Sequence, residues 1–218
     1  MICEGLFVNL MSTLVKLTIP LLKITLLHNE EELLWQRFKE GDSGALGQLS
    51  RSHYRALFNY AAKFTKDREI VRDCIQDLFL ELWERREHLT ETPFVRIYLI
   101  KSLRNNLFRK LRQERWMLES EDLDEDLPFS DHTSAESTLI ESELFQENAG
   151  KIKVVLAKLP KRQQEIIFLK FYEGLSNDQI AEILTMNRQS VANLLHRALT
   201  SLKTNWFSLA KMLLFLWG

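Results

Sequence analysis

Apolar residues recur every three or four positions along most of the chain, which is the spacing of helices that bury one face. No segment alternates apolar and polar residues as a half-buried strand would. The spacing predicts helices over about residues 30–40, 45–63, 67–86, 94–112, 142–159 and 160–174. We therefore predict an all-α fold, with the first four helices packed as a bundle.

The pattern near the C-terminal end predicts a helix-turn-helix. Ser176 and Gln179 have the spacing of a capping box, so a helix can begin there. Residues 185–187 break the pattern, and Asn187 can cap the following helix. The residues expected in the apolar seam of the two helices are Ile180, Leu184, Met186, Val191, Leu194 and Leu195.

The second helix of this pair carries a polar face. Amide, hydroxyl and guanidinium groups presented in this way are suited to reading base edges in a DNA major groove. The side chains concerned are Arg188, Gln189, Ser190, Asn193 and Arg197. The same pattern also fits two amphipathic helices of any helical domain, so both readings stand at this point.

Charge changes the picture, because it is sorted along the chain. Residues 101–115 hold six basic residues and one acid, residues 117–148 hold eleven acids and no Lys or Arg, and residues 151–211 hold ten basic residues and four acids. An acidic run repels itself and rarely forms a core, so residues 113–144 are predicted to be a linker. Two basic segments joined in this way favour a nucleic-acid-binding protein.

Candidate catalytic chemistry is absent from the sequence. Cys3 and Cys74 are too few for a disulfide framework, and no His lies at metal-ligand spacing from another His or Cys. No glycine-rich phosphate loop, G-x-S-x-G or H-E-x-x-H is present. We therefore expect a cytoplasmic protein that is not an enzyme and needs no metal or cofactor.

The two ends of the chain are apolar. Lys16, Pro20 and Lys23 interrupt residues 6–27, and charges near a bilayer centre are costly, so we interpret residues 1–28 as an N-terminal extension. Met11 is a plausible true start, and peptides from residues 1–10 in the native protein would contradict this. The tail, residues 206–218, is shorter than the ~20 residues that span a bilayer. We expect it to pack on its own domain, with an interface to a partner as the alternative.

Two predicted helices carry surface chemistry. Asp73, Gln76, Asp77 and Glu81 align into an acidic and amide stripe, which is either a solvated face or a docking face for a partner's helices. On the helix over residues 94–112, basic side chains accompany aromatic ones. Such a helix can hold phosphates and stack on unpaired bases, or it can have a core of aromatics and a solvated charged face.

The residues of these segments resemble a known family. D-x-x-Q-D-x-F-L-x-L-W from Asp73, followed by Y-L-x-x-S-L-R-N-N-L from Tyr98, is similar to region 2 of a sigma factor of bacterial RNA polymerase. L-P-x-x-x-x-x-I-I-x-L-x-F-Y-E-G-L-S-x-x-x-I-A-E-I-L from Leu159 is similar to region 4. The two regions in this order, with a short linker, resemble the extracytoplasmic-function (ECF) group over about residues 30–205.

The resemblance implies roles for particular residues. Contact with the β′ clamp of core polymerase would fall to Asp73, Gln76, Asp77, Phe79, Leu82 and Trp83. Recognition and melting of the −10 element would fall to Phe94, Tyr98, Lys101, Arg104, Asn105, Arg109 and Arg112, beside a loop at residues 89–94. The −35 element would be read by the polar face from Arg188 to Arg197, and the β flap would be met around residues 166–171. The family also implies an anti-sigma partner, often membrane-bound.

The implied layout is an N-terminal extension (1–28), region 2 (29–112), an acidic linker (113–144), region 4 (145–205) and an apolar tail (206–218). The chain departs from the family at Ala192 and Leu194, where basic residues are frequent, and at Thr185, where Gly is common and a slightly different turn is expected. Two other functions fit parts of the sequence. One is a polymerase-independent helix-turn-helix regulator with an N-terminal sensing or dimerisation bundle, and the other is a metal-dependent nucleic-acid enzyme using the Asp73, Asp77 and Glu81 carboxylates.

Overall fold

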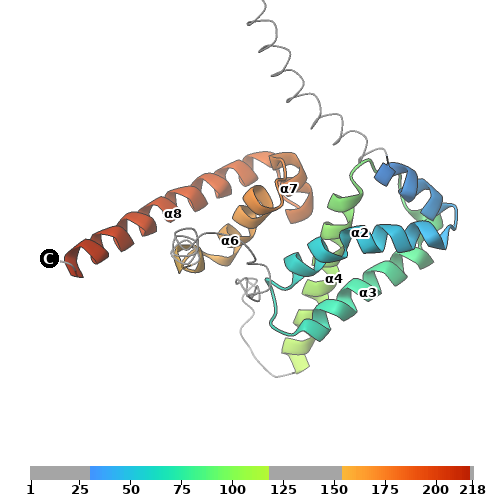
Figure 1. Cartoon of the computed structure of the whole chain (residues 1–218), viewed down its shortest axis with the longest axis horizontal. Helices are drawn as coiled ribbons and strands as arrows, with labels where there is room; N and C mark the ends of the chain where they lie inside the picture. The colour runs from blue at the N-terminus through green and yellow to red at the C-terminus, as the bar shows by residue number, and fades with distance from the viewer. Residues whose placement is uncertain (1–29, 118–153, 217–218) are drawn as a thin grey trace, which may run out of the picture. The chain divides into compact units, whose positions relative to one another are not determined.

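All regular secondary structure in the described part of the protein is helical. The computed structural model describes the backbone of residues 30–117 and 154–216 and the side chains of residues 30–114 and 154–204, and no strand occurs among them. The elements (Figure 1) are a helix over residues 30–39, α2 (Ser43–Ala61), α3 (Arg68–Glu84), the 3-10 turn η1 (Arg86–His88), α4 (Val95–Met117), a turn of helix over 154–157, α6 (Lys161–Ile167), the π-helix η3 (Phe168–Tyr172), α7 (Asn177–Leu184) and α8 (Arg188–Leu216). The all-α prediction is confirmed; the N-terminal extension and the linker lie outside the described residues, apart from the last five residues of α4.

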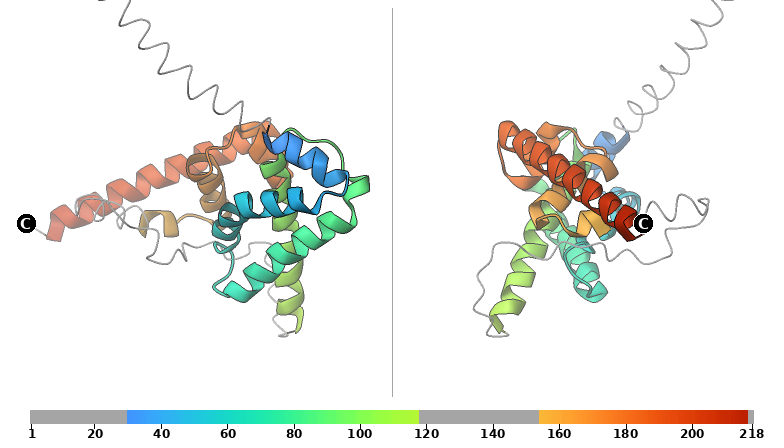
Figure 2. Two further views of the ribbon diagram at one scale, coloured as in Figure 1. Left: turned by 45° about the vertical axis from the view of Figure 1, so that its right-hand side comes forward. Right: turned by 90° about the vertical axis from the view of Figure 1, so that its left-hand side faces the viewer.

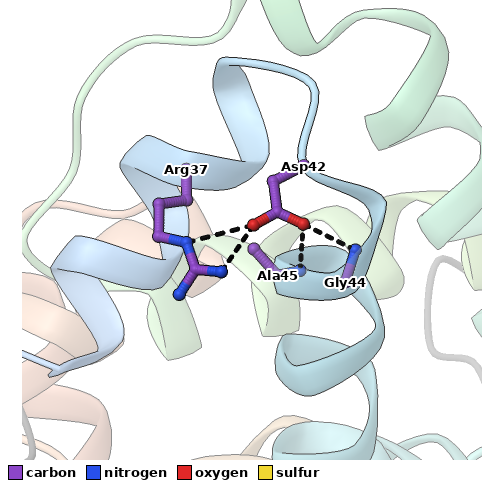
Figure 3. Close-up of polar contacts among 4 residues, drawn as sticks. All are labelled: Arg37, Asp42, Gly44 and Ala45. Atoms are coloured by element: carbon purple, nitrogen blue, oxygen red, sulfur yellow. Dashed lines mark hydrogen bonds and ion pairs between the residues drawn. The ribbon is translucent and has the colours of Figure 1, made fainter.

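The start of α2 is fixed by Asp42 (Figure 3). Its Oδ1 accepts hydrogen bonds from the backbone N–H groups of Gly44 (2.8 Å) and Ala45 (3.1 Å), which would otherwise lack partners at a helix start. Its Oδ2 accepts from Nε and Nη2 of Arg37, at 3.0 and 2.6 Å. The hydrogen bond from Arg37, followed by that from Ala45, lowers the pKa of Asp42. Because of this cap, α2 begins at Ser43, two residues before the predicted start.

The described chain forms two compact units, and α2 and α3 each run through both. The first unit contains residues 30–53 and 79–96. Its core is aromatic: the buried rings of Trp35 and Phe38 lie 5.3 Å apart between centroids, and Phe38 lies 6.4 Å from Trp83. The indole N–H of Trp35 donates to the carbonyl of Thr90 at 3.2 Å, which anchors the loop before α4.

The second unit contains residues 54–78, 97–117 and 154–216. A row of aromatic rings runs through it, with successive centroids 5.1, 5.2, 6.2 and 4.9 Å apart. The rings, in spatial order, belong to Phe108 of α4, Phe64 after α2, Tyr60 of α2, and Phe168 and Tyr172 of η3. Aromatic pairs at these separations add to the stability gained from burial alone.

The helix-turn-helix lies in this unit and has the predicted caps. The Ser176 side chain accepts from the backbone N–H of Gln179, and the Gln179 side chain accepts from that of Ser176, which is a complete capping box. Asn187 accepts from the backbone N–H of Ser190 at 2.7 Å and caps α8. Thr185, between the helices, has φ 53° and ψ 48°. Thr185 therefore adopts the left-handed conformation that Gly, the common residue of the family here, adopts readily.

The predicted seam is partly buried. Ile180, Val191 and Leu194 are buried, whereas Leu184, Met186 and Leu195 are half-buried. Within the described residues, no helix is both long enough and apolar enough to cross a membrane.

Several helix boundaries differ from the predictions. α4 ends at Met117, five residues past the predicted end, and α8 continues to Leu216 (Figures 1 and 2). The apolar tail up to Leu216 is therefore part of the same helix as the reading face. Pro160 is the residue before α6 rather than its first residue, and Gly174 has the positive φ (70°) expected of a cap. The π-helix before it was not predicted, because its spacing of apolar residues is close to that of an α-helix.

Candidate functional site

The acidic stripe lies on α3, and most of it faces solvent as predicted. Asp73, Gln76 and Asp77 are exposed and Glu81 is half-buried. Lys110 of α4 donates to Asp73 Oδ2 at 3.1 Å. Burial alone would lower the pKa of Lys110, but this hydrogen bond and the neighbouring negative charges raise it. Lys110 therefore neutralises one carboxylate of the stripe.

The apolar residues assigned to this surface lie in different places. Phe79 is half-buried, and Leu82 is 4% exposed, so Leu82 belongs to the core and supports α3 instead of presenting itself to a partner. Trp83 is half-buried against Phe38, and the Arg86 guanidinium lies 4.7 Å from its ring centroid. The part of Trp83 left at the surface remains available to a partner.

Leu80 was missed by the sequence analysis. It is 54% exposed, and it follows Gln76 and Asp77 by four and three residues on the same helix. These spacings place the three side chains on one face of α3. The signal in the sequence was this spacing from Gln76 and Asp77, which distinguishes Leu80 from the buried apolar residues around it.

The second candidate surface lies along the start and the outer face of α4. Phe94 is 47% exposed beside the N-terminus of the helix, and its backbone N–H donates to the hydroxyl of Thr92 at 3.1 Å. The other residues assigned to the −10 element follow one another along α4 at spacings of mostly three or four residues, so they lie along one face of the helix. Tyr98 and Lys101 are half-buried, and the exposed members are Asn105, Arg109 and Arg112.

Arg104 is not available in the way that was predicted. Its Nε and Nη2 lie 2.9 and 3.3 Å from the two carboxylate oxygens of Glu165 on α6. The Arg104 side chain is 16% exposed and that of Glu165 is 5% exposed. The guanidinium also lies 4.1 Å from the ring centroid of Phe108. In this conformation Arg104 is occupied by a carboxylate from the C-terminal helices.

The third candidate surface is the polar face of α8. Arg188, Gln189, Asn193 and Arg197 are exposed and Ser190 is half-buried, which matches the predicted face. Gln189 Nε2 donates to Asn193 Oδ1 at 3.1 Å, and Arg188 lies 3.5 Å from Asp178 of α7. Leu194 is 8% exposed and packs in the seam, so it is not part of the reading face, whereas Ala192 is half-buried.

The segment around residues 166–171 was assigned only loosely to a partner. Ile166 and Leu169 are buried, whereas Phe171 and Tyr172 are 62% and 63% exposed. The π-helix presents these two consecutive aromatic side chains at the surface. Any partner contact here therefore involves Phe171 and Tyr172, and the second of these was not among the predicted residues.

Groups suited to catalysis do not assemble in the described residues. No three His, Cys, Asp or Glu side chains among them lie in an arrangement that could hold a metal ion. Cys74 is buried, and burial raises the pKa of its thiol to about 11, so the thiol stays protonated near neutral pH. The candidates for function are therefore the three helix surfaces above and the exposed aromatic pair Phe171 and Tyr172.

Family comparisons match both groups of helices. Residues 49–117 match the family Sigma-70 region 2, and residues 149–202 match the family Sigma-70, region 4.

Named relatives align with this chain over most of their own length. The RNA polymerase sigma factor NccH of Alcaligenes xylosoxydans xylosoxydans is 28% identical over 170 residues, which cover 77% of this chain and 90% of NccH. The RNA polymerase sigma factor YlaC of Bacillus subtilis is 24% identical over 74% of this chain and 91% of YlaC. The ECF RNA polymerase sigma factor SigL of Mycobacterium tuberculosis is 24% identical over 74% of this chain and 89% of SigL.

Solved structures share the fold. CnrH, in complex with the cytosolic domain of CnrY, aligns with a TM-score of 0.55 at 22% identity and covers 80% of this chain and 95% of CnrH. The sigma factor RpoE of Bartonella quintana, in complex with the anti-sigma factor NepR, aligns with a TM-score of 0.53 at 19% identity and covers 73% of this chain and 94% of RpoE.

Proposed function

The chain belongs to the extracytoplasmic-function group of the sigma-70 family, and we propose that it binds core RNA polymerase and directs it to promoters with −10 and −35 elements. The observation that carries this proposal is the presence of region 2 and region 4 in one chain, in that order. The two matches together cover more than half of its residues. A polymerase-independent regulator lacks this support, because the relatives that match over both regions are named sigma factors.

The exposed face of α3 is the proposed contact with the β′ clamp of core polymerase. It combines the carboxylates of Asp73 and Asp77 with the amide of Gln76 and the apolar side chain of Leu80. An apolar anchor inside a polar surround is the arrangement in which a few residues contribute most of the binding energy at an interface. Phe171 and Tyr172 are the proposed contact with the β flap.

The outer face of α4 is the proposed site for the −10 element. Arg109 and Arg112 would hold backbone phosphates, and the exposed ring of Phe94 would stack on an unpaired base beside the loop at residues 89–94. Trapping bases outside the stack offsets an unstacking cost of a few kcal/mol each, so melting requires no catalysis by this chain.

The exposed face of α8 is the proposed reader of the −35 element. Gln189, Asn193 and Arg197 would reach base edges in the major groove, and Arg188 would hold a phosphate. Each phosphate neutralised on duplex DNA contributes about 0.9 to the slope of log affinity against log salt, so binding should weaken steeply with salt.

Regulation is proposed to involve an anti-sigma partner in the cytoplasm. Support comes from the solved structures of similar fold, since RpoE was solved with its anti-sigma factor NepR and CnrH with the cytosolic domain of CnrY.

The test is run-off transcription with purified chain and core polymerase. Candidate promoters would come from mapping transcription starts after overexpression of the chain. We expect transcripts that require both the chain and core enzyme. Binding to palindromic duplex without polymerase, and no promoter-dependent transcript from any mapped start, would overturn the proposal.

A further inference from the structure

Glu165 pairs with Arg104, one of the basic residues of α4 that the family resemblance assigns to the −10 element. Its carboxylate meets the Arg104 guanidinium through two contacts of 2.9 and 3.3 Å, which is the two-point geometry that arginine also uses for phosphate. A second, longer contact joins α4 to α7, because Lys101 Nζ lies 3.9 Å from Glu182 Oε1. Two cations of α4 are thus paired with carboxylates of α6 and α7.

The Glu165 contact is well supported by its surroundings. The Tyr60 hydroxyl donates to Glu165 Oε1 at 2.6 Å, and both side chains are buried. The charge of Glu165 and its hydrogen bond more than offset the effect of burial and raise the pKa of Arg104, so the guanidinium stays charged. Phe168 lies three residues after Glu165 and packs near the ring of Tyr60, at 6.2 Å between centroids. Charge, hydrogen bonding and ring packing therefore favour the same arrangement.

We propose that Glu165 acts as an internal substitute for a DNA phosphate and keeps α4 of the free chain from engaging a nucleic-acid strand through Arg104. The inference rests on the proposed function, because it takes α4 to be the surface that binds the −10 strand. A carboxylate of the same chain has an advantage over a phosphate in solution, because it does not need to be brought from bulk. DNA binding through Arg104 then requires α6 to leave α4, and the contact with Glu182 adds a weaker, exposed pair to the same competition.

The experiment measures salt-dependent binding of the full chain to fluorescein-labelled oligothymidylate, without polymerase. In Glu165→Gln the two-point ion pair is lost and Arg104 becomes available to a phosphate. One additional phosphate contact on a single strand should steepen the slope of log affinity against log salt by about 0.7 and raise affinity about five- to tenfold at low salt. Combining Glu165→Gln with Arg104→Gln should return the slope to that of the wild type.

The matched control is Glu40→Gln, which makes the same side-chain change and removes the same charge. Glu40 is exposed after the helix over residues 30–39 and lies on neither α4 nor α8. It should leave the slope unchanged, so a general charge effect would appear equally in both variants. If Glu165→Gln does not fold by circular dichroism, Tyr60→Phe removes only the hydroxyl that orients Glu165 and should change affinity in the same direction by a smaller factor.

A slope in Glu165→Gln equal to that of Glu40→Gln would overturn the inference, as would an unchanged affinity in a folded Tyr60→Phe variant when Glu165→Gln does not fold. These results do not depend on polymerase. If the chain gives a normal run-off transcript but Glu165→Gln leaves the slope unchanged, the role of Glu165 is rejected and the proposed function stands. If Glu165→Gln steepens the slope but the chain gives no transcript, the competition between Glu165 and a phosphate stands and the proposed function is rejected.

Discussion

Arg104 and Glu165 form a two-point ion pair, with Nε to Oε1 at 2.9 Å and Nη2 to Oε2 at 3.3 Å, and both side chains are largely shielded from solvent. Burying two charges costs desolvation energy, which their attraction recovers only when further hydrogen bonds complete the geometry. Tyr60 supplies such a bond at 2.6 Å. The three side chains should therefore behave as one energetic unit.

A double-mutant cycle tests this coupling. Tyr60→Phe should lower the free energy of unfolding by about 1.5–3 kcal/mol, because a hydrogen bond to a charged acceptor is lost. In a Glu165→Leu background the same change should cost under about 0.5 kcal/mol, since no carboxylate remains to accept the bond. Urea unfolding of the four proteins measures both values, and equal costs in the two backgrounds would show that the residues are not coupled.

Leu80→Ala should weaken binding to core polymerase. Burying a leucine side chain is worth about 1.5–3 kcal/mol, so truncation should raise Kd about ten- to 150-fold. Leu33→Ala is the matched control, because Leu33 is similarly exposed (56% against 54%) but lies on the helix over residues 30–39. Trp83→Ala should also weaken binding, but it removes packing against Phe38 and so needs a parallel stability measurement. Equal affinity of wild type and Leu80→Ala would remove Leu80 from the interface.

Arg197→Ala should impair −35 recognition and leave binding to core polymerase intact. If the guanidinium makes a two-point contact with a base, its loss should cost about 1–3 kcal/mol and relax specificity at one position. Lys203→Ala, which removes another exposed cation from the same helix, serves as the control. Competition among duplexes with single changes in the −35 element measures this, and unchanged discrimination in Arg197→Ala would show the assignment to be wrong.

Thr185→Asn should stabilise the turn between α7 and α8. The left-handed conformation costs an ordinary residue about 1–2 kcal/mol, whereas Asn tolerates it. Thr185 is exposed, so little packing is lost, and we expect a gain of about 0.5–1 kcal/mol. Thr185→Val keeps the branched side chain and should give no gain. Thermal unfolding followed by circular dichroism distinguishes the two variants. Equal melting temperatures would show that the left-handed conformation of Thr185 does not lower the stability of the protein.

His53 should make the protein less stable in mild acid. Burial, followed by the charge of Arg96, lowers the pKa of His53 to about 4, even though Glu31 Oε1 lies 3.5 Å from its Nε2. Burial prevails because Nε2 has no hydrogen-bond partner among the described residues.

The folded chain therefore holds His53 neutral while the unfolded chain takes up a proton. As the pH falls from about 6.5 to about 4, stability should drop by up to about 1.4 kcal/mol per pH unit from this residue. His53→Gln should show a shallower fall over that window in urea titrations at several pH values. Parallel curves for the two proteins would show that His53 does not carry this dependence.

Local features of the sequence determined the helical fold and the family. These features are local: the helical spacing, the capping box at Ser176 and the cap at Asn187 each involve residues within four positions of one another. They can therefore be recognised from neighbouring residues alone. The errors at the ends of α2 and α4 amount to a few residues, because the ends depend on caps and packing that the apolar spacing does not encode.

The tertiary structure decided which surface residues are available. The family resemblance assigned Arg104 to the −10 element, but its partner Glu165 comes 61 positions later. Leu80 and Leu82 are similar in sequence, yet packing exposes one and buries the other. A side chain's exposure and charge pairing depend on elements distant in the chain, and those contacts form only when the helices pack together. The sequence by itself thus determined the helices and their family, and folding determined which of their cations and leucines can meet a partner.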